Sequence, residues 1–177
     1  GIPTMAEELM LQRDLEVLAY TGGQLHAHNI STRRSVNLIR TAKQKGLNVT
    51  ASVAIMNLVL TDESLYQFDT NYKVQPPLRT QDDIDALIGG ILDGTIDCIT
   101  SNHVPIEQER KMLEFTYADP GAISLETAYA LSNECLSRQL DVTGLVELWA
   151  YKSRNILRLP TPKIEVNAVA NLTIFNP

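Results

Sequence analysis

Polar residues that could do chemistry follow directly after one apolar stretch of the chain. Residues 96–100 read as a buried strand entered through a glycine turn at Gly94, and Ser101, Asn102 and His103 come next. Polar groups at the carboxyl end of a buried parallel strand are what a (β/α) barrel presents to its substrate. The sequence therefore places a candidate site at this strand end.

The elements that would position this site alternate between strands and helices. Periodicity, capping residues and glycine turns predict strands at residues 24–30, 47–56 and 96–100. Helices are predicted at residues 4–20, 31–45, 80–94, 124–136 and 145–157. Such alternation through short turns is typical of a parallel sheet covered by helices. The predicted fold class is α/β, with too few strand–helix units to close an eight-stranded TIM barrel of roughly 250 residues.

Two of these elements carry detailed expectations. The pattern of Thr4 followed by Glu7 is that of a capping box, in which the glutamate would bond to the backbone at the start of its own helix. In the strand at 47–56, side chains alternate between two faces. Thr50, Ser52 and Met56 share the polar-leaning face, which a barrel would turn inward.

The same pattern predicts how the chain divides. Residues 1–159 are expected to form a partial (β/α) barrel, and residues 160–177, which alternate weakly, to supply strands of an added β element. An open α/β sheet fits the pattern as well. The connection 57–80 is long, and connections of that length are usually functional. Lys73 and Arg79 in this connection are interpreted as solvated side chains.

Composition excludes several classes of function. The net charge is −6 and the basic residues are scattered, which argues against a nucleic-acid-binding face. No apolar run reaches the roughly 18 residues of a membrane span, and the first residues are not a signal peptide. Cys98 and Cys135 read as small buried hydrophobes of a reducing compartment, with a disulfide or metal site as the weaker interpretation. We therefore expect a cytoplasmic protein.

Several segments together resemble the bacterial dihydroorotases of the amidohydrolase superfamily. They are residues 1–8, the Ile30-Ser-Thr turn, the run from Asp69 to Thr80, residues 93–97 and residues 125–127. The resemblance implies the C-terminal part of a (β/α)8 TIM barrel of the metal-dependent hydrolase type, followed by the start of the family's closing β domain. It also implies a cyclic amide hydrolase of pyrimidine biosynthesis that interconverts carbamoyl aspartate and dihydroorotate, usually with zinc.

The positions that would bind the metal depart from the family's pattern. The metal-binding histidine before Ile-Ser-Thr is Asn29 here, the second histidine ligand is Met56, and the catalytic aspartate is Asn102. An amide is a poor zinc ligand, and a thioether suits copper(I) better than zinc. An amide also exchanges no proton near pH 7, so Asn102 cannot serve as a general acid or base. We expect no metal cofactor at these positions.

The positions that contact substrate in the family are also altered. The asparagine before Pro-Pro-Leu-Arg is Gln75, His103 is retained, and the last histidine of the family's Asp-His-Ala-Pro-His run is Ile106. The sequence therefore favours a catalytically inactive, structural or regulatory relative, a pseudoenzyme. Inactive relatives in this family associate with aspartate transcarbamoylase, which makes that enzyme the first candidate partner.

Two alternatives stay open. The chain could be an active metal-dependent dihydroorotase that binds zinc through His26, His28 or His103, which requires His28 to face inward. It could also be a barrel half that pairs with itself or with the missing half, because an isolated half exposes strand edges and apolar helix faces. A homo-oligomer is expected in that case. The plainer interpretation of the three histidines is that they are packed or hydrogen-bonded imidazoles.

Overall fold

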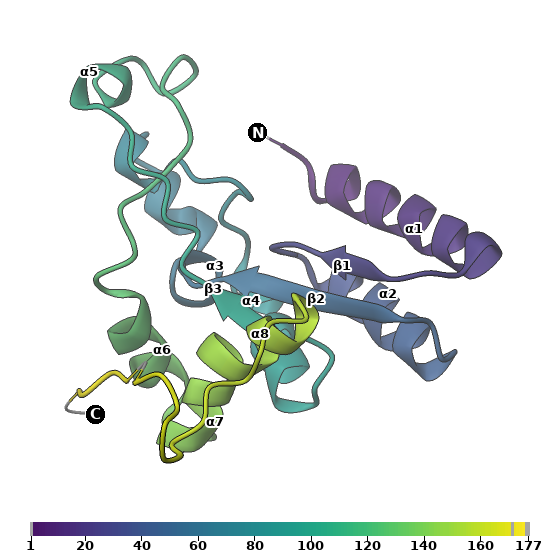
Figure 1. Cartoon of the computed structure of the whole chain (residues 1–177). Helices are drawn as coiled ribbons and strands as arrows, with labels where there is room; N and C mark the ends of the chain where they lie inside the picture. The colour runs from purple at the N-terminus through teal and green to yellow at the C-terminus, as the bar shows by residue number, and fades with distance from the viewer. Residues whose placement is uncertain (1, 171, 176–177) are drawn as a thin grey trace.

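A three-stranded parallel sheet lies at the centre of the computed structural model, which describes residues 2–170 and 172–175. The strands run in the order β1 (Leu25–Ala27), β2 (Val49–Ala54) and β3 (Cys98–Thr100). Leu25 pairs with Val49, and Ser52 pairs with Cys98. All three strands therefore end at the same edge of the sheet, as the alternation in the sequence predicts (Figure 1).

Helices pack around this sheet. The long ones are α1 (Thr4–Thr21), α2 (Arg33–Gln44) and α4 (Gln81–Leu92). The later part of the chain forms α6 (Ala128–Leu136), α7 (Val142–Val146), a π-helical turn η3 (Glu147–Tyr151) and α8 (Lys152–Ile156), of which η3 packs on β3. Short elements fill the loops: α3 (Met56–Val59), η1 (Asp62–Leu65), η2 (Thr70–Tyr72) and α5 (Gln108–Lys111). Among the described residues, no helix combines the length and apolar composition that crossing a membrane requires.

The core forms where α2 and α4 meet the sheet. Val36 and Ile39 of α2 are fully buried, as are Val53 of β2 and Ile96 before β3. A Cβ atom at Gly90 of α4 would lie 3.0 Å from Val36 Cγ1 and 3.2 Å from Ile96 Cδ1. The glycine thus permits the close approach of α4 to α2, which keeps the sheet's outer face covered.

An ion pair joins α2 to the entry of β3. Lys43 Nζ donates to both carboxylate oxygens of Asp97 at 2.8 Å, and the same carboxylate accepts from the backbone N–H of Ala51 at 2.8 Å. Because Ala51 lies in β2, the contact fixes β3 against β2 and so sets where the polar strand ends meet.

Two loop segments extend together from the sheet. Residues 61–73 and 107–120, which we call the arm, lie side by side, with α5 at the tip (Figure 1). Lys73 Nζ donates to the backbone carbonyls of Phe115 at 2.7 Å and Ala118 at 2.6 Å, so Lys73 is not the solvated side chain that the sequence suggested. The long connection is therefore ordered by contacts with a second loop.

Two expectations about local structure are wrong, and the β element expected at residues 160–177 stays a prediction. The strand predicted at 47–56 ends at Ala54, because the backbone turns helical at Ile55 (φ −56°, ψ −38°) and Met56 begins α3. No side chain caps α1, whose N-cap is Pro3. Among residues 160–170 and 172–175 no strand forms, and 171, 176 and 177 lie outside the described residues. A strand needs a neighbouring strand for its backbone hydrogen bonds, and this tail has none within the described chain.

Candidate functional site

A hollow of about 400 Å³ lies at the carboxyl ends of the strands. Polar side chains line this mouth pocket, and they come from α1, from the turns after β1 and β3, and from the Pro-Pro-Leu-Arg loop: Glu7, His28, Asn29, Gln75, Arg79 and Asn102. The structure thus brings together three of the predicted site residues, Asn29, Gln75 and Asn102. It is the location that a (β/α) barrel uses for its active site.

A chain of hydrogen bonds crosses this pocket. The Thr100 hydroxyl donates to Asn29 Oδ1 at 2.7 Å, Asn29 Nδ2 donates to Asn102 Oδ1 at 3.2 Å, and Asn102 Nδ2 donates to the Gln75 carbonyl at 2.9 Å. Asn29 and Asn102 adopt left-handed backbone conformations, with φ of 55° and 48°, which asparagine tolerates better than most residues. The two amides are therefore held facing each other, and neither can ionise.

Beneath this series of hydrogen bonds, two imidazole rings share one hydroxyl group. His26 Nε2 and His28 Nδ1 each lie 3.2 Å from Ser52 Oγ, while His26 Nδ1 lies 2.9 Å from Thr50 Oγ1. Both rings thus lie on the polar side of the sheet, the side that carries Thr50 and Ser52. His28 therefore faces inward, as the alternative of an active enzyme requires. Burial lowers the pKa of His26, and His28 lowers it further, whereas Asp97 raises it. His26 is therefore favoured in its neutral form.

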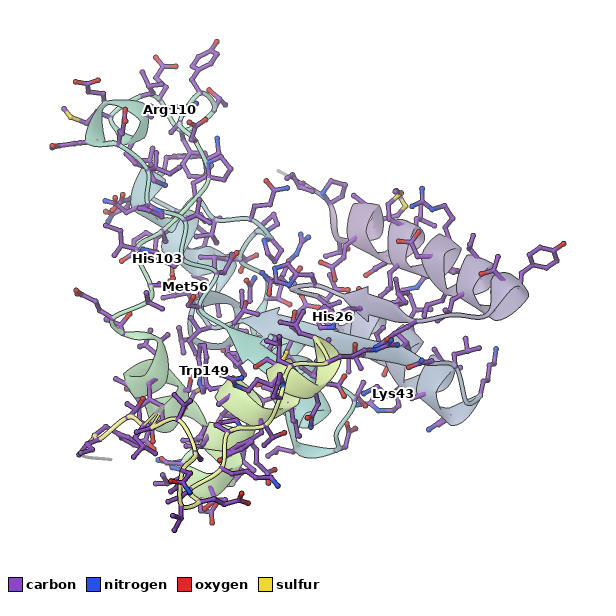
Figure 2. All side chains as sticks on the ribbon, in the orientation of Figure 1. His26, Lys43, Met56, His103, Arg110 and Trp149 are labelled. Atoms are coloured by element: carbon purple, nitrogen blue, oxygen red, sulfur yellow. The ribbon has the colours of Figure 1, made fainter. Side chains whose placement is uncertain are left out.

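His103 serves a different contact. Its Nδ1 accepts from the backbone N–H groups of Ser124 at 3.1 Å and Leu125 at 3.2 Å. A nitrogen that accepts hydrogen bonds carries no proton, so the neutral ring bears its proton on Nε2. Neither nitrogen then offers a lone pair to a metal, and His103 anchors the segment before α6. Figure 2 shows His103 near the base of the arm and His26 over the sheet.

Besides His103, two further predicted positions, Met56 and Ile106, lie outside the mouth pocket. Met56 packs against the hydrophobic core from the start of α3. Ile106 lies against Gly121. A Cβ atom added to Gly121 would lie 2.8 Å from Ile106 Cγ1. The alternation of side chains between two faces does not extend to Met56, because it requires an extended backbone and the backbone is already helical there.

Sequence reasoning missed a buried polar network at the pocket wall. Arg79 is only 8% exposed, and its Nε donates to Ser31 Oγ at 3.1 Å while its Nη1 donates to the Ile2 carbonyl at 2.8 Å. Glu7 accepts from the backbone N–H of Ser31 at 2.9 Å and from the hydroxyl of Ser35 at 2.6 Å. The interpretation of Arg79 as solvated is therefore wrong. The sequence feature that could have indicated the burial of Arg79 is the apolar run Pro-Pro-Leu directly before it.

The donor set of the pocket does not fit zinc. No group of three or more His, Cys, Asp or Glu side chains that could hold a metal forms within residues 2–170 and 172–175. At the positions that the resemblance assigns to metal ligands, two neutral amides are hydrogen-bonded to each other and a methionine packs against the core. Structural and catalytic zinc sites are built from imidazole, thiolate and carboxylate donors. The arrangement can bind a polar ligand by hydrogen bonds.

Comparison with solved structures defines the class. L-hydantoinase from Arthrobacter aurescens matches 95% of this chain with a TM-score of 0.85 and 25% identity, and the match covers 39% of that protein. Dihydropyrimidinase from Brevibacillus agri matches 86% of the chain with a TM-score of 0.80, which is 35% of its own length, at 24% identity. The fold is a part of the TIM barrel of the amidohydrolase superfamily, and the predicted fold class is confirmed.

Sequence relatives narrow this class. The chain is 44% identical over 179 residues to a dihydroorotase from Thermoanaerobacter sp. and 36% identical over 176 residues to one from Deinococcus radiodurans. These matches cover 100% and 99% of the chain, but only 41% and 42% of the relatives. No family model matches the sequence. The chain is a homologue of the bacterial dihydroorotases, which confirms the resemblance, and it spans about two-fifths of their length.

Proposed function

We propose that this chain is a dihydroorotase-like protein of pyrimidine biosynthesis that has lost its catalytic metal centre and has a structural or regulatory role. Homology to dihydroorotases over the whole chain supports the pathway. The observation that carries the loss of catalysis is the hydrogen bond between Asn29 and Asn102, at two positions where the family has a metal-binding histidine and a catalytic aspartate.

The chemistry of the reaction explains why this matters. Hydrolysis of a cyclic amide at neutral pH needs a strong nucleophile, which a metal ion supplies by lowering the pKa of its bound water to roughly 7. The amide pair offers no anionic ligand for such an ion. Asn102 also cannot take up the proton that a general base removes. The pocket keeps hydrogen-bonding groups and loses the means of hydrolysis.

The role proposed in place of catalysis is assembly. Aspartate transcarbamoylase is the first candidate partner, with a homo-oligomer of this protein as part of the assembly. A cytoplasmic location belongs to the same proposal, and the two free cysteines, Cys98 and Cys135, agree with a reducing compartment. Burial raises the pKa of both thiols to about 11, so they are expected to act as inert packing groups.

Metal analysis of the intact protein combined with a dihydroorotate hydrolysis assay tests the proposal. We expect less than stoichiometric zinc and no turnover above the uncatalysed rate. The matched control is the double variant Asn29→His, Asn102→Asp, which restores the family's residues at the two mouth-pocket positions and should retain more zinc than the parent. Stoichiometric zinc together with turnover in the unmodified protein would refute the loss of catalysis.

One observation favours the alternative of an active dihydroorotase. His28 faces the polar side of the sheet and lines the mouth pocket together with the carboxylate of Glu7. If His28 had taken over metal binding, His28→Ala would abolish both zinc content and turnover, while His103→Ala would change neither. Absence of zinc from the parent protein removes this alternative directly.

A further inference from the structure

A second hollow, smaller and mostly apolar, adjoins the mouth pocket. It measures about 160 Å³, and Leu65, Val74, Leu78 and Phe115 form much of its wall. Ile2, Gln75 and Pro77 line both hollows and form the boundary between them. We call the smaller hollow the ring pocket. None of the family's metal-ligand positions lines it, so its role is separate from the loss of the metal centre.

The walls of the ring pocket are fixed in place by contacts within the arm. Lys73 Nζ donates to the Phe115 carbonyl at 2.7 Å and lies 5.3 Å from the centroid of the Phe115 ring. Phe68 packs edge-on against the same ring, with centroids 5.8 Å apart. The backbone N–H of Gly121 donates to the Lys73 carbonyl at 2.8 Å. The two loops that form the pocket are therefore held together without any ligand, and a preformed pocket loses little entropy on binding.

The size of the ring pocket selects its occupant. An apolar cavity of about 150 Å³ holds one benzene molecule, so a hollow of this volume fits one six-membered ring. Its wall is predominantly aliphatic and aromatic, which favours an apolar ring over a polar one. Leu78 and Val74 are buried, so little of the wall can move aside for a larger group.

Arg79 supplies the charge next to this pocket. A guanidinium has five N–H donors, and within the described residues Arg79 uses one for Ser31 and one for the carbonyl of Ile2, itself a boundary residue. Among the described residues, no carboxylate oxygen lies within ion-pair distance of this guanidinium. Glu7 lines the mouth pocket too, but its hydrogen bonds go to Ser31 and Ser35, so it is not a direct ion-pair partner of Arg79. The unused N–H donors of Arg79 can therefore receive a small anion.

We propose that the two hollows together bind a small arylalkyl carboxylic acid, with its ring in the ring pocket and its carboxylate at Arg79. Such a ligand would modulate the structural or regulatory role proposed above by binding alone, without any chemical step. The site uses hydrogen bonds and apolar contacts only, so it is expected to bind in the absence of metal.

Calorimetry of the intact protein with three probes tests each half of this site: phenylacetate, acetate and phenylacetamide. We expect saturable binding of phenylacetate, with acetate and phenylacetamide each at least tenfold weaker. Acetate lacks the ring and phenylacetamide lacks the charge, so each isolates one contribution. Equal affinity for phenylacetate and acetate, or no saturable binding of phenylacetate, would overturn the proposal.

Variants locate the binding. Leu65→Trp fills the ring pocket and should weaken phenylacetate at least tenfold, while Leu113→Trp, on the same arm but outside the pocket, should leave it unchanged. Arg79→Met should weaken phenylacetate to the level of phenylacetamide without changing phenylacetamide binding. Unchanged phenylacetate binding in Leu65→Trp or in Arg79→Met contradicts the assigned site. The comparison of probes on the parent protein stands even where a variant fails to fold.

Discussion

Replacing Glu7 by alanine should destabilise the protein far more than its position on a surface helix suggests. Its carboxylate crosses from α1 to the N-terminus of α2, where it accepts from the backbone N–H of Ser31 at 2.9 Å, the hydroxyl of Ser31 at 2.5 Å and the hydroxyl of Ser35 at 2.6 Å. Ser31 and Ser35 are fully buried, so water cannot replace the lost acceptor at either residue. A negative charge at this helix end also interacts favourably with the helix dipole.

The size of the effect follows from these contacts. A hydrogen bond to a charged group contributes about 1.5–3 kcal/mol. The Ser35 hydroxyl keeps a second contact with Thr32 Oγ1 at 2.9 Å, so it recovers part of its loss. The Ser31 hydroxyl keeps only Arg79 Nε, a donor that cannot accept its proton. The Ser31 N–H has no substitute either, so we expect Glu7→Ala to lower the free energy of unfolding by about 3–5 kcal/mol. That is a fifth or more of the roughly 5–15 kcal/mol that stabilises a typical domain.

Urea denaturation monitored by circular dichroism measures this loss. Glu16→Ala is the control, because Glu16 is an exposed residue of the same helix and the substitution changes helix propensity equally. We expect Glu16→Ala to lie within about 0.5 kcal/mol of the parent and Glu7→Gln, which keeps one carbonyl acceptor, to lie between the two alanine variants. If Glu7→Ala and Glu16→Ala had the same midpoint and slope, the network at α2 would be energetically irrelevant and the reasoning wrong.

Three further substitutions test other contacts. Burial lowers the pKa of His26 in the folded state below its ordinary 6.5, so the unfolded chain binds a proton at higher pH than the folded chain does. The free energy of unfolding therefore falls as the pH drops below 6.5. The His26→Gln variant should show a smaller fall between pH 7 and pH 5, measured by urea denaturation at each pH. Lys73→Met should speed limited proteolysis within the arm, with Lys45→Met as the unaffected control. Ser132→Ala removes the acceptor of the indole N–H at 3.0 Å and should cost about 1–2 kcal/mol of unfolding free energy, against little change for the exposed Ser137→Ala.

The sequence predicts the elements well wherever local signals decide them. Thr32 illustrates this, because its side chain accepts from the backbone N–H of Ser35 at 3.1 Å and caps α2, at the start of the helix predicted over residues 31–45. Glu7 shows the opposite case. Its spacing from Thr4 fits a capping box, but the buried serines of α2 are better partners for its carboxylate. Tertiary contacts between residues 24 or more positions apart leave no trace in a local pattern.

The candidate site was predictable in its members and less so in its geometry. Asn29, Gln75 and Asn102 meet at the mouth pocket, as motif positions implied. Strand parity does not extend to Met56, because the backbone becomes helical at Ile55 and carries the side chain into the core. Position relative to a strand end can be read from sequence, whereas the direction of a side chain beyond that end depends on backbone angles that the sequence does not specify.

The hydrogen bonds of the mouth pocket favour an amide at residue 102. Its Oδ1 accepts from Asn29, and its Nδ2 donates to the Gln75 carbonyl at 2.9 Å. A carboxylate at this position would accept from Asn29 equally well, but its second oxygen would face the carbonyl oxygen of Gln75, and two acceptors at that distance repel each other. A histidine in place of Asn29 would in turn lose the amide's simultaneous contacts with Thr100 and Asn102. The replacements at 29 and 102 therefore support each other, so that reverting either one alone is expected to break the chain of hydrogen bonds without restoring a metal ligand set.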